Sequence, residues 1–107
     1  MGNILDITDA DFDREVIQST VPVLVDFWSP TCVPCRAMAP VIAALAEEFG
    51  DEAKFVKVNI FESNAVAGKL GVSTLPTLIL FSGGQMVERL MGVHAKDKLI
   101  ELIDQYV

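Results

Sequence analysis

The chain has 107 residues, about half of them hydrophobic, which is enough for one hydrophobic core but too few for two. Its formal net charge of −7 disfavours binding to nucleic acids or anionic membranes, because both carry negative charge themselves. The longest apolar run is far below the roughly 18 residues that a membrane span needs. We therefore expect one soluble domain over residues 1–107 that binds neither nucleic acid nor membrane.

The first stretch, MGNILDITDADFD, is acidic and lacks the basic segment followed by an apolar one that marks a secretory signal. This pattern favours an intracellular, cytoplasmic protein, although a mature form whose signal had been removed would read the same way. Within this stretch, ILDI at residues 4–7 predicts a short edge strand. Thr8 or Asp9 is then expected to cap a helix that runs to about Ser19.

The next segments alternate between strand and helix. VPVLVDFW at 21–28 is an almost unbroken apolar run, which is typical of a strand covered on both faces. Apolar residues at helical spacing then predict a helix over residues 32–49, with a kink at Pro40. KFVKVNI at 54–60 predicts a further strand, and residues 63–70 predict a short helix.

The last part of the sequence predicts a hairpin and a final helix. TLILF at 77–81 and MVERLM at 86–91 flank the turn sequence SGGQ, which indicates two antiparallel strands. AKDKLIELIDQYV then has the apolar spacing of an amphipathic helix. The resulting order, βαβαβαββα, requires crossover connections between parallel strands and places helices on both faces of an α/β sheet. No repeat, linker or second domain is visible in the sequence.

Cys32 and Cys35 are the only cysteines, and they form a C-x-x-C motif where the buried strand ends and the long helix begins. A crosslink between them would close a very small loop and remove little entropy from the unfolded chain, so a structural bridge is a weak interpretation. The start of a helix offers unpaired amide hydrogens and a partial positive charge, and both stabilise a thiolate. We expect Cys32 to titrate well below ~8.5, the value of a free thiol.

Cys35 lies one turn further into the helix, close enough to attack a mixed disulfide on Cys32 yet more shielded from partners. This predicts that Cys32 attacks a substrate disulfide and that Cys35 resolves the intermediate. Pro34 suits the first helical turn, where its missing N–H costs nothing. Asp26, the one ionisable residue of the apolar strand, is either a buried general base for Cys35 or a strand-end carboxylate in contact with solvent.

The motifs VDFW, C-x-P-C-R, LPT, the GG turn and Gly92 follow one another over nearly the whole chain in the order of the thioredoxin family, which this sequence resembles. The resemblance implies a thioredoxin fold, with a central mixed five-stranded sheet flanked by four helices. It also implies a protein disulfide reductase that serves as an electron donor in cell redox homeostasis. No cofactor is implied beyond the redox-active Cys32–Cys35 pair, which a thioredoxin reductase-type enzyme would recharge. Protein disulfides would be the substrates, and we expect a monomer.

The resemblance also implies roles for single residues. Cys32 would be the nucleophile, Cys35 the resolving thiol and Asp26 the buried acid. Lys57 matches the lysine that lies near that acid, and Pro76 matches the proline that faces the cysteine pair after a cis peptide bond. The residues expected to bind substrate are Trp28, Thr31, Val33, Pro34, Leu75, Gly92 and Val93.

Three positions depart from the family pattern. Typical members read W-C-G-P-C, whereas this chain has Thr31 before the first cysteine and Val33 between the two. Phe61 stands where many relatives carry an aspartate. All three changes alter the surface that a partner covers and leave the thiol pair intact.

Other interpretations of the cysteine pair remain open. A thioredoxin-fold binding module could clasp a partner without turnover, and a more oxidising potential would give a disulfide oxidase or isomerase. A zinc site needs four protein ligands, or three and a water, but the chain offers two cysteines and the distant His94. Two chains together could supply four thiolates, either to zinc in a bridging dimer or to an iron–sulfur cluster, but we expect no metal.

Overall fold

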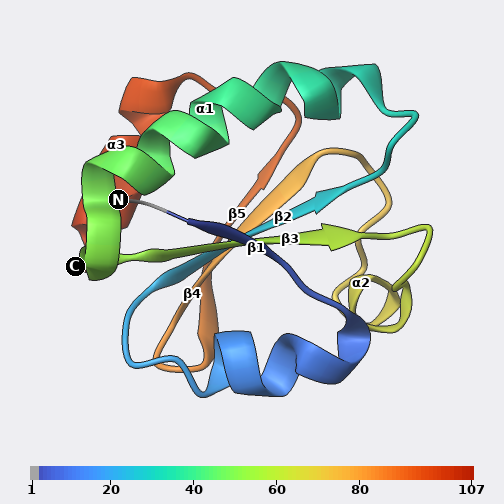
Figure 1. Cartoon of the computed structure of the whole chain (residues 1–107), viewed down its shortest axis with the longest axis horizontal. Coiled ribbons are helices and arrows are strands. Elements are labelled where there is room, and N and C mark those ends of the chain that lie inside the picture. The colour runs from blue at the N-terminus through green and yellow to red at the C-terminus, as the bar shows by residue number, and fades with distance from the viewer. Residues whose placement is uncertain (1–2) are drawn as a thin grey trace.

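Five strands form one mixed sheet in the computed structural model, which describes residues 3–107 (Figure 1). The strands are β1 (Ile4–Asp6), β2 (Val23–Trp28), β3 (Lys54–Asn59), β4 (Thr77–Ser82) and β5 (Gln85–Met91). Their order across the sheet is β1-β3-β2-β4-β5, in which β1, β3 and β2 are parallel, β4 is antiparallel to β2, and β5 is antiparallel to β4. The predicted mixed sheet is confirmed.

Within residues 3–107, four helical segments cover the sheet, as predicted. They are η1 (Asp9–Asp11) continuing into η2 (Asp13–Ile17), α1 (Val33–Phe49) followed by the short turn η3 (Gly50–Glu52), α2 (Ala65–Lys69) and α3 (Lys96–Asp104). Figure 1 shows α1 and α3 over one face of the sheet, and α2 with the blue helical segment near the N-terminus over the other. Among the described residues, no helix is long and apolar enough to cross a membrane.

Strand alternation divides the apolar residues into two cores, because successive side chains of a strand point to opposite faces. Leu24 of β2 lies in the core beneath α1 and α3. Its neighbours Val23 and Val25 lie in the core beneath η1, η2 and α2. The same alternation places Asp26 and Trp28 on the face that α1 covers.

The first helical segment differs in form from the regular helix expected over residues 8–19. It is a single 3-10 turn followed by wider, π-helical turns, and it ends at Ile17. Thr8 precedes it in an extended conformation, and the Thr8 backbone N–H donates to the Asp11 carboxylate at 3.1 Å. Thr8 therefore stands at the N-cap position, and Asp11 supplies the acceptor oxygen. Elsewhere α2 is shorter than the predicted 63–70, and α1 runs on through Pro40.

Asp9 caps a different helix from its own. Its carboxylate oxygens accept hydrogen bonds from the backbone N–H groups of Ala65 and Val66, each at 3.0 Å, at the start of α2. The Asp9 N–H in turn donates to the Ser63 hydroxyl at 3.3 Å. Asp9 thereby ties the first helical segment to α2, and of the two residues expected as its cap, Thr8 or Asp9, it is Thr8 that takes the N-cap position. A cap supplied from another element has no local signal in the sequence.

The hairpin between β4 and β5 turns at two glycines with positive φ angles, Gly83 (60°) and Gly84 (79°). Two-residue hairpin loops of this kind favour glycine, because side chains rarely adopt such angles. A Cβ atom at Gly84 would also lie 3.0 Å from the backbone oxygen of Ile17. The GG turn is therefore required both by backbone conformation and by its packing against η2.

Replacing Asp9 by alanine should destabilise the protein by about 1–2 kcal/mol, because a missing cap leaves the first amides of a helix without acceptors. Urea unfolding of wild type and Asp9→Ala measures the difference. Asp9→Asn keeps one acceptor oxygen and should lose less. An Asp9→Ala midpoint equal to that of wild type would show that the cap contributes nothing.

Candidate functional site

The cysteine pair lies at the carboxyl end of β2, where the chain turns into α1. The buried Ser29 accepts a hydrogen bond from the Cys32 N–H through its backbone oxygen, at 3.2 Å, and this closes the loop between strand and helix. Cys32 is the N-cap of α1. A disulfide joins it to Cys35, with the two Cα atoms 5.3 Å apart. The structure therefore holds the oxidised form of the pair.

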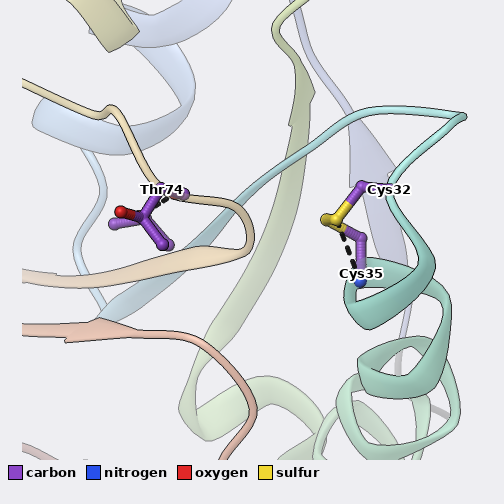
Figure 2. Close-up of a disulfide and its surroundings, with 4 residues drawn as sticks. Cys32, Cys35 and Thr74 are labelled. Carbon is purple, nitrogen blue, oxygen red and sulfur yellow. Dashed lines mark hydrogen bonds between the residues drawn. A yellow bond between two sulfur atoms is a disulfide. The ribbon is translucent and has the colours of Figure 1, made fainter.

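The Cys32 sulfur occupies the place that a capping oxygen takes in an ordinary helix. The backbone N–H of Cys35, the third residue of the helix, points at Cys32 Sγ with an N···S distance of 3.1 Å (Figure 2). Pro34 is the second helical residue and has no N–H to leave unpaired. A negative charge on the Cys32 sulfur would thus meet both this donor and the positive end of the α1 dipole.

The two sulfur-bearing residues differ in exposure. Cys32 is half-buried, whereas only 4% of Cys35 is exposed. Thr31, Val33 and Pro34 around them are exposed. A partner approaching α1 along its axis therefore meets Cys32 before Cys35.

A small cavity of about 80 Å³ lies beneath the pair, between α1 and the sheet. It is lined by Asp26, Trp28, Cys35, Arg36, Ala39 and Lys57. The sequence patterns predicted a part in the site for Asp26, Trp28, Cys35 and Lys57, and Arg36 belongs to the C-x-P-C-R motif, whereas Ala39 was not connected to the site. Ala39 lies four positions after Cys35, and this spacing places both on one face of a helix, so the helical pattern contained the signal.

Asp26 is buried rather than in contact with solvent, with 2% of its surface exposed. Its Oδ1 atom has no hydrogen-bond partner among the described residues. Burial raises the pKa of Asp26 from 3.8 to about 6, although the positive charge of Lys57 acts in the opposite direction. A carboxyl group with this pKa can take up and release a proton near neutral pH.

Lys57 stands opposite Asp26 in the parallel pairing of β2 with β3. Its Nζ atom lies 4.2 Å from the centre of the Trp28 ring, a cation–π contact. Trp28 is half-buried, and its Nε1 atom is buried without a hydrogen-bond partner among the described residues. Asp26, Trp28 and Lys57 thus form one group on the sheet beneath Cys35.

The loop before β4 provides the other side of the site. Thr77 pairs with Phe27 near the end of β2, so the preceding residues lie beside the cysteine loop. The Leu75–Pro76 peptide bond is cis, as predicted. The Gly92 N–H donates to the Pro76 carbonyl at 2.8 Å, and the Thr77 hydroxyl donates to the carbonyl of Thr74. Figure 2 shows the disulfide pointing toward the loop that carries Thr74.

Several exposed apolar side chains stand on the segments that surround the disulfide. Val33 is 65% exposed, Phe61 63% and Val93 56%. Phe61 lies in the turn after β3, where its N–H donates to the Asn59 side chain at 3.0 Å. The loop after β5 is further held by a 3.0 Å contact between His94 Nε2 and the Met91 carbonyl. We refer to Val33, Phe61 and Val93 as the apolar rim.

The described residues contain no group of three or more His, Cys, Asp or Glu side chains that could hold a metal ion. The site itself presents a disulfide between the half-buried Cys32 and the buried Cys35, with the buried acid Asp26 beneath Cys35. This combination supports thiol–disulfide exchange.

Comparisons with known proteins agree with this geometry. The family model for thioredoxin matches residues 3–105. Thioredoxin 1 of Synechococcus elongatus is 44% identical over 101 residues, which cover 94% of each chain. The thioredoxin of Haemophilus influenzae is 41% identical over 107 residues, the full length of both. The chloroplastic M-type thioredoxin of Chlamydomonas reinhardtii is 41% identical over 101 residues, which cover 94% of this chain and 72% of that protein.

Replacing Asp26 by asparagine should stabilise the protein at neutral pH. The folded state holds the Asp26 proton more tightly than the unfolded chain does, with a pKa of about 6 against 3.8, so wild type loses stability as the pH rises through this range. The variant lacks this loss, so its free energy of unfolding should exceed that of wild type by up to about 3 kcal/mol at about pH 7. The difference should become smaller as the pH falls and should stop changing with pH below about pH 4.

Urea unfolding of the oxidised proteins across that pH range measures the Asp26 effect. Asp104→Asn is the matched control, because it makes the same chemical change at an exposed acid at the end of α3, outside the site. A stability difference between wild type and Asp26→Asn that does not change with pH would contradict the assignment.

In the reduced protein, Cys32 should form a thiolate well below pH ~8.5, the value for a free thiol. The reason is the N–H donor at 3.1 Å together with the helix end. The ultraviolet absorbance of the thiolate, followed during titration of Cys35→Ser, isolates the Cys32 signal. Titration at the free-thiol value would refute the stabilisation.

Proposed function

The chain belongs to the thioredoxin family and is a thiol–disulfide redox protein, and we propose that it reduces disulfides in other proteins by exchange at Cys32 and Cys35. One observation carries this proposal: Cys32 caps α1 and is half-buried, whereas Cys35 is buried above an acid. A binding module would need neither a second thiol nor a proton acceptor beneath it.

In the proposed reaction, the Cys32 thiolate attacks one sulfur of a substrate disulfide. The substrate S–S bond breaks, one substrate thiolate leaves, and Cys32 is joined to the substrate by a mixed disulfide. Cys35 then gives up its proton and attacks the Cys32 sulfur, which releases the second substrate thiolate. The substrate has gained two electrons, and the chain ends in the Cys32–Cys35 disulfide form that the structure holds.

We assign the proton of Cys35 to Asp26. Both residues line the same cavity, and its volume of about 80 Å³ is large enough for a bridging water. The Asp26 pKa of about 6 means that the acid is mostly ionised at neutral pH yet binds a proton readily. Lys57, with its charge next to Asp26 in the sheet, would set this balance.

The substrate would bind as an extended peptide along the backbone of residues 75–76, in the loop before β4 opposite the disulfide. We call this backbone the loop edge. The half-buried Leu75 offers a backbone amide and carbonyl for such a peptide, and the buried Pro76 shapes the edge. Trp28, Thr31, Pro34 and Gly92 would complete the contact surface. The apolar rim favours substrates with apolar side chains next to their disulfide, because contact would remove both surfaces from water.

We further propose that residues 1–107 act as one monomeric domain, without a resident cofactor, in the cytoplasm. A disulfide reductant is useful only where the surroundings keep dithiols reduced, which favours that compartment. The oxidised pair would accept two electrons from a thioredoxin reductase-type enzyme. The chain would thereby carry electrons from that enzyme to protein disulfides, a role in electron transport and redox homeostasis.

An insulin reduction assay with dithiothreitol tests the proposed function. Wild type should accelerate insulin precipitation over dithiothreitol alone, because it passes electrons to the insulin disulfides faster. Cys32→Ser should remove the acceleration by eliminating the nucleophile. Reduced Cys35→Ser, mixed with insulin after dithiothreitol has been removed, should trap a mixed disulfide that intact-protein mass spectrometry detects. Wild type that binds insulin without accelerating its reduction would instead identify a binding module.

A further inference from the structure

Arg89 of β5 makes contacts outside its own strand. Its guanidinium donates two hydrogen bonds to consecutive carbonyl groups, from Nη1 to Leu70 and from Nη2 to Gly71, the second at 2.8 Å. Arginine can do this because its planar head presents several N–H donors in a fixed fork. Both carbonyls lie just after the end of α2.

The position of Arg89 on β5 explains the direction in which its side chain points. Successive strand side chains point to opposite faces, and the preceding residue Glu88 faces the side of α3, where the hydroxyl of Tyr106, just after that helix, donates to its carboxylate at 3.4 Å. Arg89 therefore faces α2. The carbonyls of Leu70 and Gly71 follow the end of α2, where the helix offers no further N–H donors, so the guanidinium supplies donors that α2 itself cannot provide.

The chain from Leu70 leads directly to the edge that faces the disulfide. Gly71, with a φ angle of 69°, turns the backbone after α2, and residues 72–74 then lead to the Leu75–Pro76 bond. Arg89 holds the beginning of this segment. Its far end is held by the Gly92 N–H on the Pro76 carbonyl at 2.8 Å. Both holding residues lie on β5 or directly after it.

We propose that Arg89 is a positioning residue for disulfide exchange, an inference that rests on the proposed function. It fixes residues 70–71 so that the loop edge at Leu75 and Pro76 keeps its place opposite Cys32. Without Arg89, the Gly71 and Val72 N–H groups still donate to carbonyls of α2, at 3.2 and 2.9 Å, but the carbonyls of Leu70 and Gly71 lose their donors and the guanidinium no longer ties the segment to β5. An extended peptide needs the whole edge, whereas a small disulfide needs only the Cys32 sulfur.

The test compares two substrates, insulin and the small aromatic disulfide dithiobis-nitrobenzoate, with Arg89→Met. For insulin, kcat/KM should fall by about fivefold, mainly through KM, because the variant loses charge-assisted hydrogen bonds that orient the loop. The rate with the small disulfide should stay at the wild-type value. Arg89→Lys keeps the charge but not the fork, and should fall between wild type and Arg89→Met.

Arg14→Met is the matched control, because Arg14 pairs on the surface with Asp11 and Glu15 of its own helical segment. It should leave both rates unchanged. If Arg89→Met loses activity equally on both substrates, or loses none on insulin, the positioning role is overturned. If Arg89→Met fails to fold, the rates of Arg89→Lys decide by the same criterion.

Wild type that fails to reduce insulin would overturn the proposed function and this inference with it. That outcome is visible before any variant is compared.

Discussion

The hydrogen-bonded register of β2 determines where every part of the site lies. Parallel pairing with β3 sets Lys57 opposite Asp26, and antiparallel pairing with β4 sets Thr77 opposite Phe27. The strand end that carries the cysteine loop therefore meets the segment that precedes β4. A slip of one residue would turn Asp26 and Trp28 to the opposite face, away from α1 and Cys35. The site thus depends on the same pairing that buries the two cores.

The burial of Asp26 is unfavourable for folding, and its surroundings only partly offset it. Lys57 does not neutralise the acid: its ammonium lies over the Trp28 ring, and its charge lowers the Asp26 pKa less than burial raises it. A close ion pair would keep the carboxylate ionised and make it a poor proton acceptor. The looser arrangement leaves Asp26 able to exchange a proton near neutral pH. This ability serves proton transfer at the site, whereas burial of the acid lowers the stability of the fold.

The sequence was sufficient to predict the elements, their order and the cysteine site, because each rests on a local pattern. The apolar run before Cys32 predicted the buried strand β2, and the helical spacing after it predicted α1. The GG turn predicted the hairpin. Features that depend on distant contacts were not predictable in the same way. Asp9 caps α2 from another element, and Arg89 reaches the end of α2 from β5, although neither residue carries a local signal of that contact. The irregular turns of η2 likewise have no counterpart in the apolar spacing.

The two cysteines are three residues apart, yet the fold gives them opposite surroundings. Cys32 stands at the helix end, where an N–H group and the helix dipole favour an anion and a partner can reach the sulfur. Cys35 stands one turn inward, where burial disfavours an anion until a proton acceptor below it is free. In the reaction that we propose, the same helix would therefore favour attack by the first sulfur and delay attack by the second until a substrate is attached. A C-x-x-C motif on an exposed loop would have neither the helix end nor the buried acid, so the order of the two steps follows from where the fold begins α1.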